Sequence, residues 1–336
     1  MTATYKDLQR ATGLSLATIS KFYNGGTVRD ENAQAIERAA ATLGFRPNGF
    51  ARSLRSRRSG TIGVLLPALD NDFHLTVIAG VESALRAHGT SVIVSSSPDA
   101  AAGAVDLLLS RMVDGIIAVP SDHDVEALAR AAERMPVVQI DWRADALDTD
   151  GVFLDNRGAG ALAARHLLDH GHRRVGVVAG DPAVSTMRER TAGFRAVVER
   201  EGGVLGPDSV VEGPLTVQHG QAAMQRLLVQ QDRPTAVFCA NYELTLGAVI
   251  ALNESGLTLG RELSVLGFDG LELAQATVPK LTVIVQPTHE LAVRAADLIH
   301  ARLTDPEADP APVDVVVAPR LVAGGSVARL VTPTEA

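Results

Sequence analysis

The segment from Gly158 to Ala163 reads Gly-Ala-Gly-Ala-Leu-Ala and fits G-x-G-x-x-A, the spacing that cradles a dinucleotide pyrophosphate. Asp181 lies about twenty residues further on at the end of an apolar run, where such folds place a carboxylate on the ribose. A nicotinamide-dependent oxidoreductase is therefore one interpretation. The glycines follow Asp155-Asn156-Arg157 rather than a strand directly, so we keep this activity as an alternative only.

Histidine and cysteine positions offer little further chemistry. His166 and His170 are four residues apart on a predicted helix, with His172 close by, which resembles a zinc-binding pair. No third ligand of suitable character accompanies them, so we expect structural roles and no metal site. Cys239 lies in an apolar run, as is typical of a buried thiol. No Ser/His/Asp or Cys/His arrangement has a supporting motif. We therefore predict a protein that is not an enzyme and holds no cofactor.

A helix that follows Ser15 has one face of small, polar and basic residues. This face holds Leu16, Ala17, Ser20, Lys21 and Asn24. Ile19 and Phe22 fall on the opposite, apolar face. Two helices joined by a tight glycine turn, the second with such an outward face, indicate a helix-turn-helix. An ordinary three-helix packing module is the alternative.

Start and stop signals place three short helices before residue 46. The first begins at Thr4, with Asp7 three residues later, and ends at Gly13. Ser15 can cap the second helix, and a third runs to Gly44. We expect the inner face of this third helix to hold Ala33, Ile36, Ala40 and Leu43.

The charge of the chain is unevenly distributed. Residues 1–60 carry ten Lys or Arg against four Asp or Glu, a balance of +6, which leaves −14 for residues 61–336 out of a total of −8. Within the basic part, residues 48–60 are weakly helical and have too little apolar area to fold alone, with Leu54 at their centre. This asymmetry predicts a polyanionic partner for the N-terminal module only.

From residue 61 onward, apolar strands alternate with amphipathic helices. We predict strands at 62–66, 91–94, 115–119, 136–140, 174–179, 209–212, 235–239 and 264–268. We predict helices near 73–88, 100–111, 124–134, 157–170, 186–201, 217–229 and 242–254. Continuous apolar strands with helical crossovers indicate two doubly wound parallel sheets in tandem. Ligands of such sheets bind beyond the carboxyl ends of the strands, so the loops that follow strands are the ones to watch.

Composition and termini narrow the class of protein. Hydrophobic residues make up 46% of the chain and charged residues 21%, which is ordinary for a globular protein. No run of 18 apolar residues is present, and the N-terminus lacks the pattern of a secretion signal. We therefore expect a cytoplasmic protein with no membrane partner.

Several short sequence motifs follow one another along nearly the whole chain, and their order and spacing are informative together. They are Thr4-x-x-Asp7-Leu8, Gly13-Leu14-Ser15-x-x-Thr18-Ile19-Ser20-Lys21-x-x-Asn24, Leu43-Gly44-Phe45-Arg46-Pro47-Asn48, Ala51-Arg52-Ser53-Leu54, Asp155-Asn156-Arg157, Gly171-His172-Arg173-Arg174, Arg188-Glu189-Arg190-x-x-Gly193-Phe194 and Leu266-Gly267-Phe268-Asp269. With them the chain resembles the lactose-repressor (LacI/GalR-type) family of bacterial transcription regulators.

The resemblance implies a small all-α helix-turn-helix head on an α/β body that resembles the periplasmic binding proteins. It places the DNA-binding domain at 1–46, a hinge helix and linker at 47–60, an N-terminal effector subdomain at 61–156 plus about 287–315, and a C-terminal one at 157–286 plus about 316–330. It also implies a homodimer on a roughly palindromic double-stranded operator, acting as a repressor under the control of a small polar effector.

The resemblance assigns roles in the head. Leu16, Ala17 and Lys21 stand where the family contacts base edges, and Leu54 where it wedges between base steps in the minor groove. Lys21 replaces the arginine that is usual there. Contacts to phosphates are implied for Ser15, Thr18, Ser20 and Asn24. For Leu16, partial burial in the core of the head is the alternative.

The resemblance also implies an effector site, with Phe73, His74, Arg190, Asn241, Asp269 and Gln286 as its residues. A guanidinium, a carboxylate and an amide near an aromatic ring suit a sugar or another polyhydroxylated molecule. A surface salt bridge with Glu189 is the alternative for Arg190. His74, Leu215 and Tyr242 depart from the family pattern, so a ligand other than a simple hexose fits as well. A solute-binding protein without gene regulation is the alternative for the whole chain.

Overall fold

The computed structural model describes residues 3–23, 26–45, 58–69, 72–96, 103–305 and 311–330. Contacts within the chain divide it into two units, Met1–Gly60 and Thr61–Ala336, here called the head and the body. Most of the predicted hinge at 47–60 lies outside the described residues, as do Asn24 and Leu54. None of the described helices has the length and apolar character needed to span a lipid bilayer.

The head begins with three helices. They are α1 (Tyr5–Thr12), α2 (Leu16–Tyr23) and α3 (Asp30–Leu43). At the start of α1 the amide nitrogen of Thr4 donates to the Asp7 carboxylate across 2.8 Å, and α1 ends at Gly13, whose φ of 69° suits a residue without a Cβ. The Ser15 hydroxyl accepts a 3.1 Å hydrogen bond from the Thr18 amide and so caps α2. The capping signals of the sequence therefore act as predicted.

The core of the head contains aliphatic and aromatic side chains from all three helices. Leu8, Ile19 and Ile36 are fully buried, and Phe45 packs beside them against Tyr5, with ring centroids 5.2 Å apart. Leu43 was predicted on the inner face of α3, and this prediction is wrong because its side chain is 39% exposed. The chain turns at Gly44, with a φ of 60°, and Phe45 fills the core instead.

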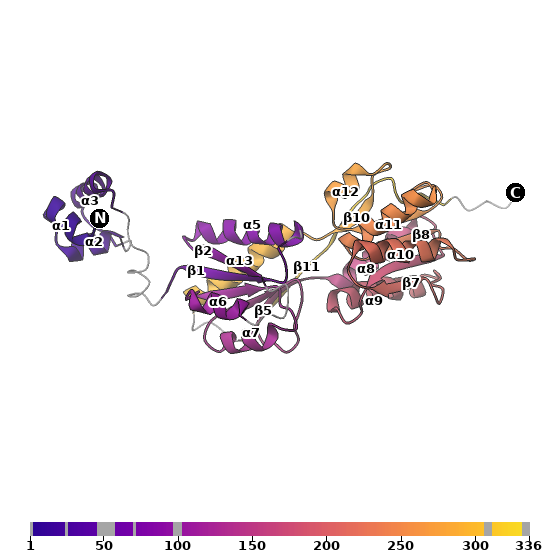
Figure 1. Cartoon of the computed structure of the whole chain (residues 1–336), viewed down its shortest axis with the longest axis horizontal. Helices are drawn as coiled ribbons and strands as arrows, with labels where there is room; N and C mark the ends of the chain where they lie inside the picture. The colour runs from indigo at the N-terminus through magenta and orange to yellow at the C-terminus, as the bar shows by residue number, and fades with distance from the viewer. Residues whose placement is uncertain are drawn as a thin grey trace. The chain divides into compact units, whose positions relative to one another are not determined.

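The first lobe of the body is a six-stranded sheet in the order β11-β5-β4-β3-β1-β2. Its strands are β1 (Thr61–Leu66), β2 (Ser91–Ser96), β3 (Gly115–Ala118), β4 (Val137–Ile140), β5 (Asp150–Leu154) and β11 (Asp314–Val317). All neighbours pair in parallel. On one side lie α5 (Asp72–Ala87) and α13 (Thr288–Thr304), and on the other α6 (Ala104–Ser110) and α7 (Val125–Ala132) (Figure 1). Helices on both faces explain why these strands are continuously apolar.

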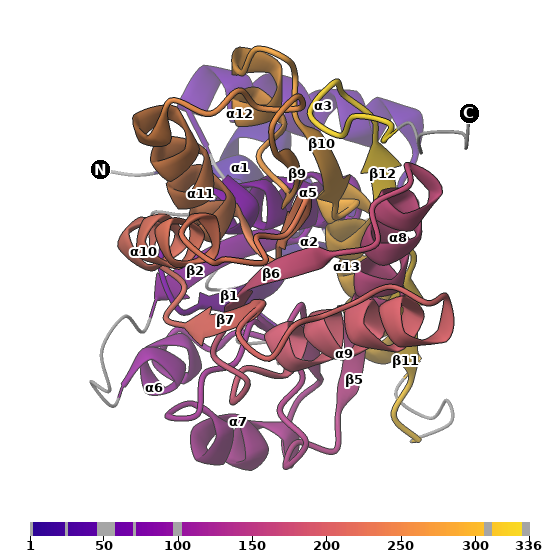
Figure 2. The ribbon, with the colours of Figure 1, turned by 90° about the vertical axis from the view of Figure 1, so that its right-hand side faces the viewer.

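The second lobe repeats the plan with the order β12-β10-β9-β8-β6-β7. Its strands are β6 (Val175–Gly180), β7 (Val210–Gly213), β8 (Ala236–Cys239), β9 (Ser264–Phe268), β10 (Thr282–Val285) and β12 (Arg320–Val322). β12 runs antiparallel to β10, and the other pairs are parallel. Its helices are α8 (Asn156–Asp169), α9 (Ser185–Arg200), α10 (Val217–Leu228), α11 (Tyr242–Ser255) and α12 (Leu271–Ala276) (Figure 2).

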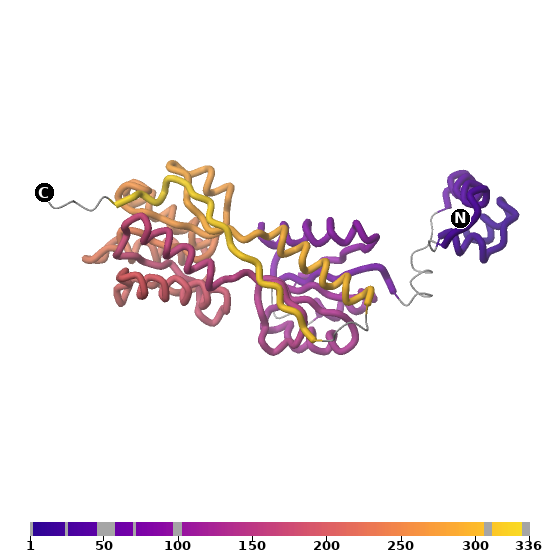
Figure 3. Tube along the Cα trace, turned by 180° about the vertical axis from the view of Figure 1, so that it is seen from behind, coloured from indigo at the N-terminus to yellow at the C-terminus, as the bar shows by residue number. Residues whose placement is uncertain are grey.

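The chain passes between the lobes three times. It leaves the first lobe after β5, returns after β10 into α13, and leaves again between β11 and β12 (Figure 3). Arg302 on α13 fixes the returning segment, because its guanidinium donates to both carboxylate oxygens of Asp150 at 2.7 and 2.8 Å. Asp150 also accepts a 2.8 Å hydrogen bond from the Val313 amide beside β11. The first lobe is thus completed by α13 and β11, which follow all of the second lobe except β12.

The two glycines of the candidate dinucleotide motif serve the packing and the capping of α8. A Cβ atom at Gly160 of α8 would lie 1.9 Å from the carbonyl oxygen of Arg190 on α9. The amide of Gly158 donates to the Asp155 carboxylate across 2.7 Å, so this side chain takes the place at the helix N-terminus that a phosphate would need. The motif therefore has a structural explanation in which no nucleotide takes part.

We expect Gly160→Ala to lower the free energy of unfolding by about 2–3 kcal/mol, because α8 and α9 must separate to admit the methyl group. Chemical denaturation followed by circular dichroism measures this loss. Arg165→Ala changes an exposed residue of the same helix and should shift stability by no more than about 0.5 kcal/mol. Equal stability of the two variants would contradict the close-packing role of Gly160.

Candidate functional site

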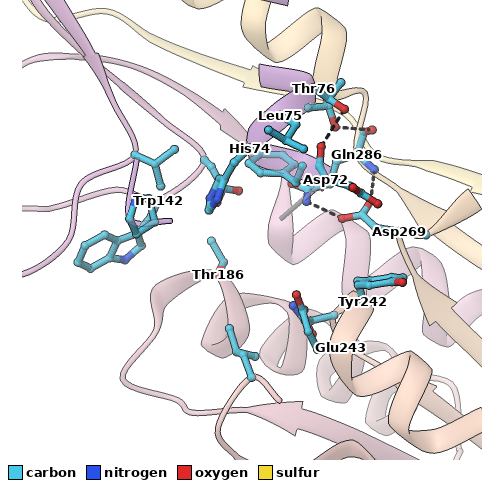
Figure 4. A pocket seen from close by; sticks show the side chains of 18 of the residues that line it. Asp72, His74, Leu75, Thr76, Trp142, Thr186, Tyr242, Glu243, Asp269 and Gln286 are labelled. Carbon is cyan, nitrogen blue, oxygen red and sulfur yellow. Dashed lines mark hydrogen bonds between the residues drawn. The ribbon is translucent and has the colours of Figure 1, made fainter. Parts of the chain in front are cut away.

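A cavity of about 1510 Å³ is lined by residues of both lobes, largely from loops that follow strands and from the first turns of helices. His74 and Trp142 of the first lobe face Tyr242 and Glu243 of the second across this space (Figure 4). All six residues implied by the family resemblance border the cavity: Phe73, His74, Arg190, Asn241, Asp269 and Gln286. Their convergence on one cavity is a geometric fact, whereas their binding roles remain predictions.

Arg190 is the most firmly held of these side chains. It is 3% exposed, and its Nε donates to Asn156 Oδ1 at 2.7 Å while Nη1 donates to the Ala240 carbonyl at 2.9 Å. The guanidinium carbon lies 3.7 Å from the centroid of the Phe268 ring. This burial does not fit the alternative of a surface salt bridge with Glu189. The second lobe therefore presents a fixed guanidinium at the cavity wall.

Burial lowers the pKa of Arg190 to about 10, and the negative charges of Asp269 and Asp141 oppose that shift. The guanidinium therefore keeps its charge near neutral pH. Its remaining N–H groups can bond to ligand oxygens. Asn156 acts as a positioning residue, which gives a structural reason for the Asp155-Asn156-Arg157 motif.

Asp269 and Gln286 form a second fixed group. Asp269 Oδ1 accepts from the Gln286 amide at 2.9 Å, and Oδ2 accepts from Gln286 Nε2 at 2.8 Å. Because a carboxylate only accepts, this contact fixes the orientation of the Gln286 side-chain amide. Its Oε1 atom is buried and has no hydrogen-bond partner among the described residues. Burial raises the pKa of Asp269, although the hydrogen bonds from Gln286 oppose that shift.

Asn241 has a structural duty as well as a place in the cavity wall. Its Oδ1 accepts a 3.2 Å hydrogen bond from the Leu244 amide and caps α11. A ligand hydroxyl would therefore meet its NH₂ group as donor. On the other wall, Phe73 and His74 lie at the start of α5 with their rings edge to face, 5.7 Å between centroids.

Asp141 and Trp142 are among the residues of the first lobe that line the cavity and were not predicted as site residues. Asp141 directly follows β4, as Asp269 directly follows β9, and both have left-handed backbones with φ of 68° and 57°. The rule that ligands bind beyond strand ends would have found Asp141. Desolvation raises its pKa to about 6, and the charge of Arg190 opposes this shift. A second carboxylate therefore faces the guanidinium from the opposite lobe.

The histidine cluster has structural partners. His172 contacts the Thr235 hydroxyl and the Ala328 carbonyl, each at 3.0 Å, and His170 Nδ1 lies 2.8 Å from the carbonyl of His166. Within the described ranges, no three His, Cys, Asp or Glu side chains are grouped so as to hold a metal ion.

In the head, the predicted reading face of α2 is largely open to solvent. Leu16 is 39% exposed, so its side chain is partly buried and partly open to solvent, and Ala17 and Lys21 are exposed beside it. Ser20 is half-buried, and Ser15 and Thr18 take part in the cap of α2. The exposed parts of Leu16, Ala17 and Lys21 can therefore contact another molecule.

Comparison with known proteins gives consistent matches. Residues 59–317 match the family of periplasmic binding proteins and the sugar binding domain of LacI family. The ribose operon repressor of Haemophilus influenzae is 32% identical over 90% of this chain and 93% of its own length. The transcriptional repressor PurR of Erwinia tasmaniensis is 31% identical over 97% of each.

Solved structures of LacI-type regulators are also similar to this chain. The lac repressor dimer bound to operator and the anti-inducer ONPF superimposes with a TM-score of 0.85 and 26% identity, over 98% of this chain and all of that one. A LacI family regulator from Enterococcus faecium with bound ribose gives a TM-score of 0.70 and 27% identity, over 80% of this chain and 99% of its own.

The raised pKa of Asp141 predicts a pH-dependent contribution to stability. Between its ordinary value of 3.8 and about 6, the unfolded chain releases a proton that the folded chain keeps, so this contribution falls as the pH rises. Asp141→Asn removes the titration and suits the left-handed backbone. We expect its stability relative to the parent to increase by about 1–2 kcal/mol from pH 4 to pH 7, since the half-buried carboxyl is partly screened. Urea unfolding of both proteins measures the difference, and a pH-independent difference would contradict the shift.

Proposed function

The chain belongs to the LacI family of transcription regulators, and we propose that it is a repressor whose binding to operator DNA is controlled by a small polyhydroxylated effector in the cavity of the body. The observation that carries the effector role is the convergence of the six family positions, from both lobes, on one cavity. Its relatives include repressors of a ribose operon and a regulator solved with bound ribose.

The chemistry of the cavity supports a ligand with many hydroxyl groups. Arg190 and the Asn241 amide can donate hydrogen bonds, while Asp141, Asp269 and Gln286 Oε1 can accept them. Trp142 and Tyr242 add aromatic surface on opposite walls. A sugar presents hydroxyls at its edges and C–H groups on its faces, so it matches both kinds of wall.

The head is the proposed DNA-reading part, with residues 1–46 as its folded domain and 47–60 as a hinge. In this proposal Leu16, Ala17 and Lys21 contact base edges in the major groove, and Leu54 enters the minor groove. Two copies of the chain bind the halves of a roughly palindromic operator, as the symmetry of a dimer requires. The phosphate contacts are assigned to Ser15, Thr18, Ser20 and Asn24.

In the body, the two effector subdomains are proposed as 61–156 with about 287–315 and 157–286 with about 316–330. A ligand that touches both lobes and binds one arrangement of the lobes more tightly than another shifts the body toward that arrangement. In this proposal the hinge at 47–60 transmits the change to the head and so alters its binding to the operator. By linkage, an effector that weakens operator binding must itself bind less tightly to the operator complex.

The proposal describes a cytoplasmic regulator that catalyses no reaction. Its named relatives are repressors, and in the rival nucleotide motif Gly160 packs against α9 while Gly158 donates to the capping Asp155. A solute-binding protein without gene regulation, the other alternative, would not need the exposed face of α2 that carries Leu16, Ala17 and Lys21.

Arg190→Ala should abolish the effector response while operator affinity stays within about threefold of the parent, because the guanidinium lies in the body and not in the head. Operator duplexes are first selected from random DNA with the full chain. The response is then measured as the change in affinity for that DNA, in either direction, caused by any compound that raises the melting temperature in a screen of sugars, sugar phosphates and nucleosides.

Arg195→Ala is the matched control, since Arg195 is an exposed residue of the same helix. Melting temperatures are measured in parallel, because loss of the guanidinium leaves Asn156 Oδ1 and the Ala240 carbonyl without their donor. Asp269→Asn provides an isosteric second variant. If both cavity variants still respond fully to the compound, the effector site lies elsewhere.

Lys21→Ala should weaken binding to the selected operator by about 10- to 100-fold and relax the base preference at one position of each half-site. Arg38→Ala removes one exposed positive charge from α3 and serves as the charge-matched control. Both variants should lower nonspecific, salt-sensitive binding to a similar extent. Titrations at several salt concentrations separate the two effects. Unchanged base preference in Lys21→Ala would remove its reading role.

A further inference from the structure

Carboxylates outnumber cations around the cavity. Among the described residues that line it there are seven Asp or Glu side chains, two guanidinium groups and no lysine. A wall with this excess of carboxylates repels anions and attracts cations. The charge of the wall therefore bears on the charge of the ligand.

Both guanidinium groups already face carboxylates of the protein. The guanidinium of Arg190 interacts electrostatically with the carboxylates of Asp141 and Asp269. Two of its nitrogens also donate hydrogen bonds, one to Asn156 and one to the Ala240 carbonyl. Arg320 Nη2 lies 3.8 Å from Glu290 Oε2. A phosphate would have to compete with these carboxylates for either cation.

Helix N-termini at the cavity are also occupied by the protein's own acids. Asp72, Glu243 and Glu290 lie in the first turns of α5, α11 and α13, and all three line the cavity. A helix N-terminus is the ordinary binding place for a phosphate or carboxylate ligand. Carboxylates in these first turns compensate the helix dipoles and repel a second anion. α9 has no acid in its first turn, and the residues it presents there, Thr186 and Met187, are uncharged.

Several fixed polar atoms of the site are hydrogen-bond acceptors, which need a ligand that supplies hydrogen-bond donors. Gln286 Oε1 is buried without a partner among the described residues, and its orientation is set by the contact between Nε2 and Asp269. The carboxylates of Asp141 and Asp269 accept only, as long as they are ionised. A ligand that brings O–H or N–H groups satisfies these atoms, whereas a phosphate brings further acceptors.

We propose that the effector is a polyol or aminopolyol that carries neither phosphate nor carboxylate. This inference rests on the proposed role of the cavity as the effector site and specifies the ligand class. At neutral pH the pKa of Asp141, about 6, leaves most of this carboxyl ionised opposite Asp269. A phosphorylated sugar should then bind at least about 100-fold more weakly than the same sugar without its phosphate.

The test separates small molecules by charge. A low-molecular-mass cell extract is passed over an anion exchanger at pH 8, which gives a flow-through of neutral and cationic compounds and a retained fraction of anions. The melting temperature of the full chain is measured with each fraction, and with the pairs ribose and ribose 5-phosphate, and glucose and glucose 6-phosphate. We expect the flow-through to raise the melting temperature by roughly 2–5 °C and the retained fraction to leave it unchanged.

Variants show whether the shift comes from the cavity. Arg190→Ala and Asp269→Asn should each lose the shift given by the flow-through, and the surface variant Arg195→Ala should keep it. A shift produced only by the retained fraction, or by the phosphorylated member of a pair, would overturn the inference while leaving the cavity as an effector site. A shift by neither fraction and by none of the four sugars would contradict the effector role itself.

Discussion

The buried guanidinium of Arg190 is the contact on which the second lobe and the cavity both depend. It links the start of α8, through Asn156, to the residue after β8, through the Ala240 carbonyl, and it stacks on Phe268 at the end of β9. A buried charge is costly unless it is paired and hydrogen-bonded. Two carboxylates, Asp269 on the same lobe and Asp141 on the other, supply the compensating charge. The same group thus orders the scaffold and sets the polarity of the site.

Most of the fold could be predicted from periodicity and capping. The strand at 264–268 was predicted with its observed bounds, and the helix predicted at 217–229 ends one residue earlier in the structure. Long apolar runs and cap residues carry these signals locally. The strands β5, β10, β11 and β12 and the helices α12 and α13 were not predicted. The short elements among them depend on their neighbours for definition. The 17-residue helix α13 has buried apolar residues at helical spacing, so its signal was present in the sequence and was missed.

The residues of the candidate site also fall into two groups, those that a local sequence motif predicted and those that only the assembled fold identifies. Arg190 and Asp269 were named because motifs surround them, whereas Asp141 lies in no quoted motif and becomes recognisable through its position after β4. Leu43 was misplaced because helical spacing continues to the end of α3, while the turn at Gly44 brings Phe45 into the core. Features that depend on packing between residues distant in the sequence could not be predicted from local sequence patterns. The wall of acidic first turns likewise becomes visible only when the helices are assembled.

The order of segments in the body has a consequence for synthesis. α13 contributes Leu291 and Ile299 to the core of the first lobe, and Arg302 on the same helix binds Asp150 at the start of β5. These residues leave the ribosome after all of the second lobe except its last strand, β12. Domains tend to fold as units when their last segment emerges. A nascent chain therefore has its complete N-terminal head long before the cavity of the body has formed.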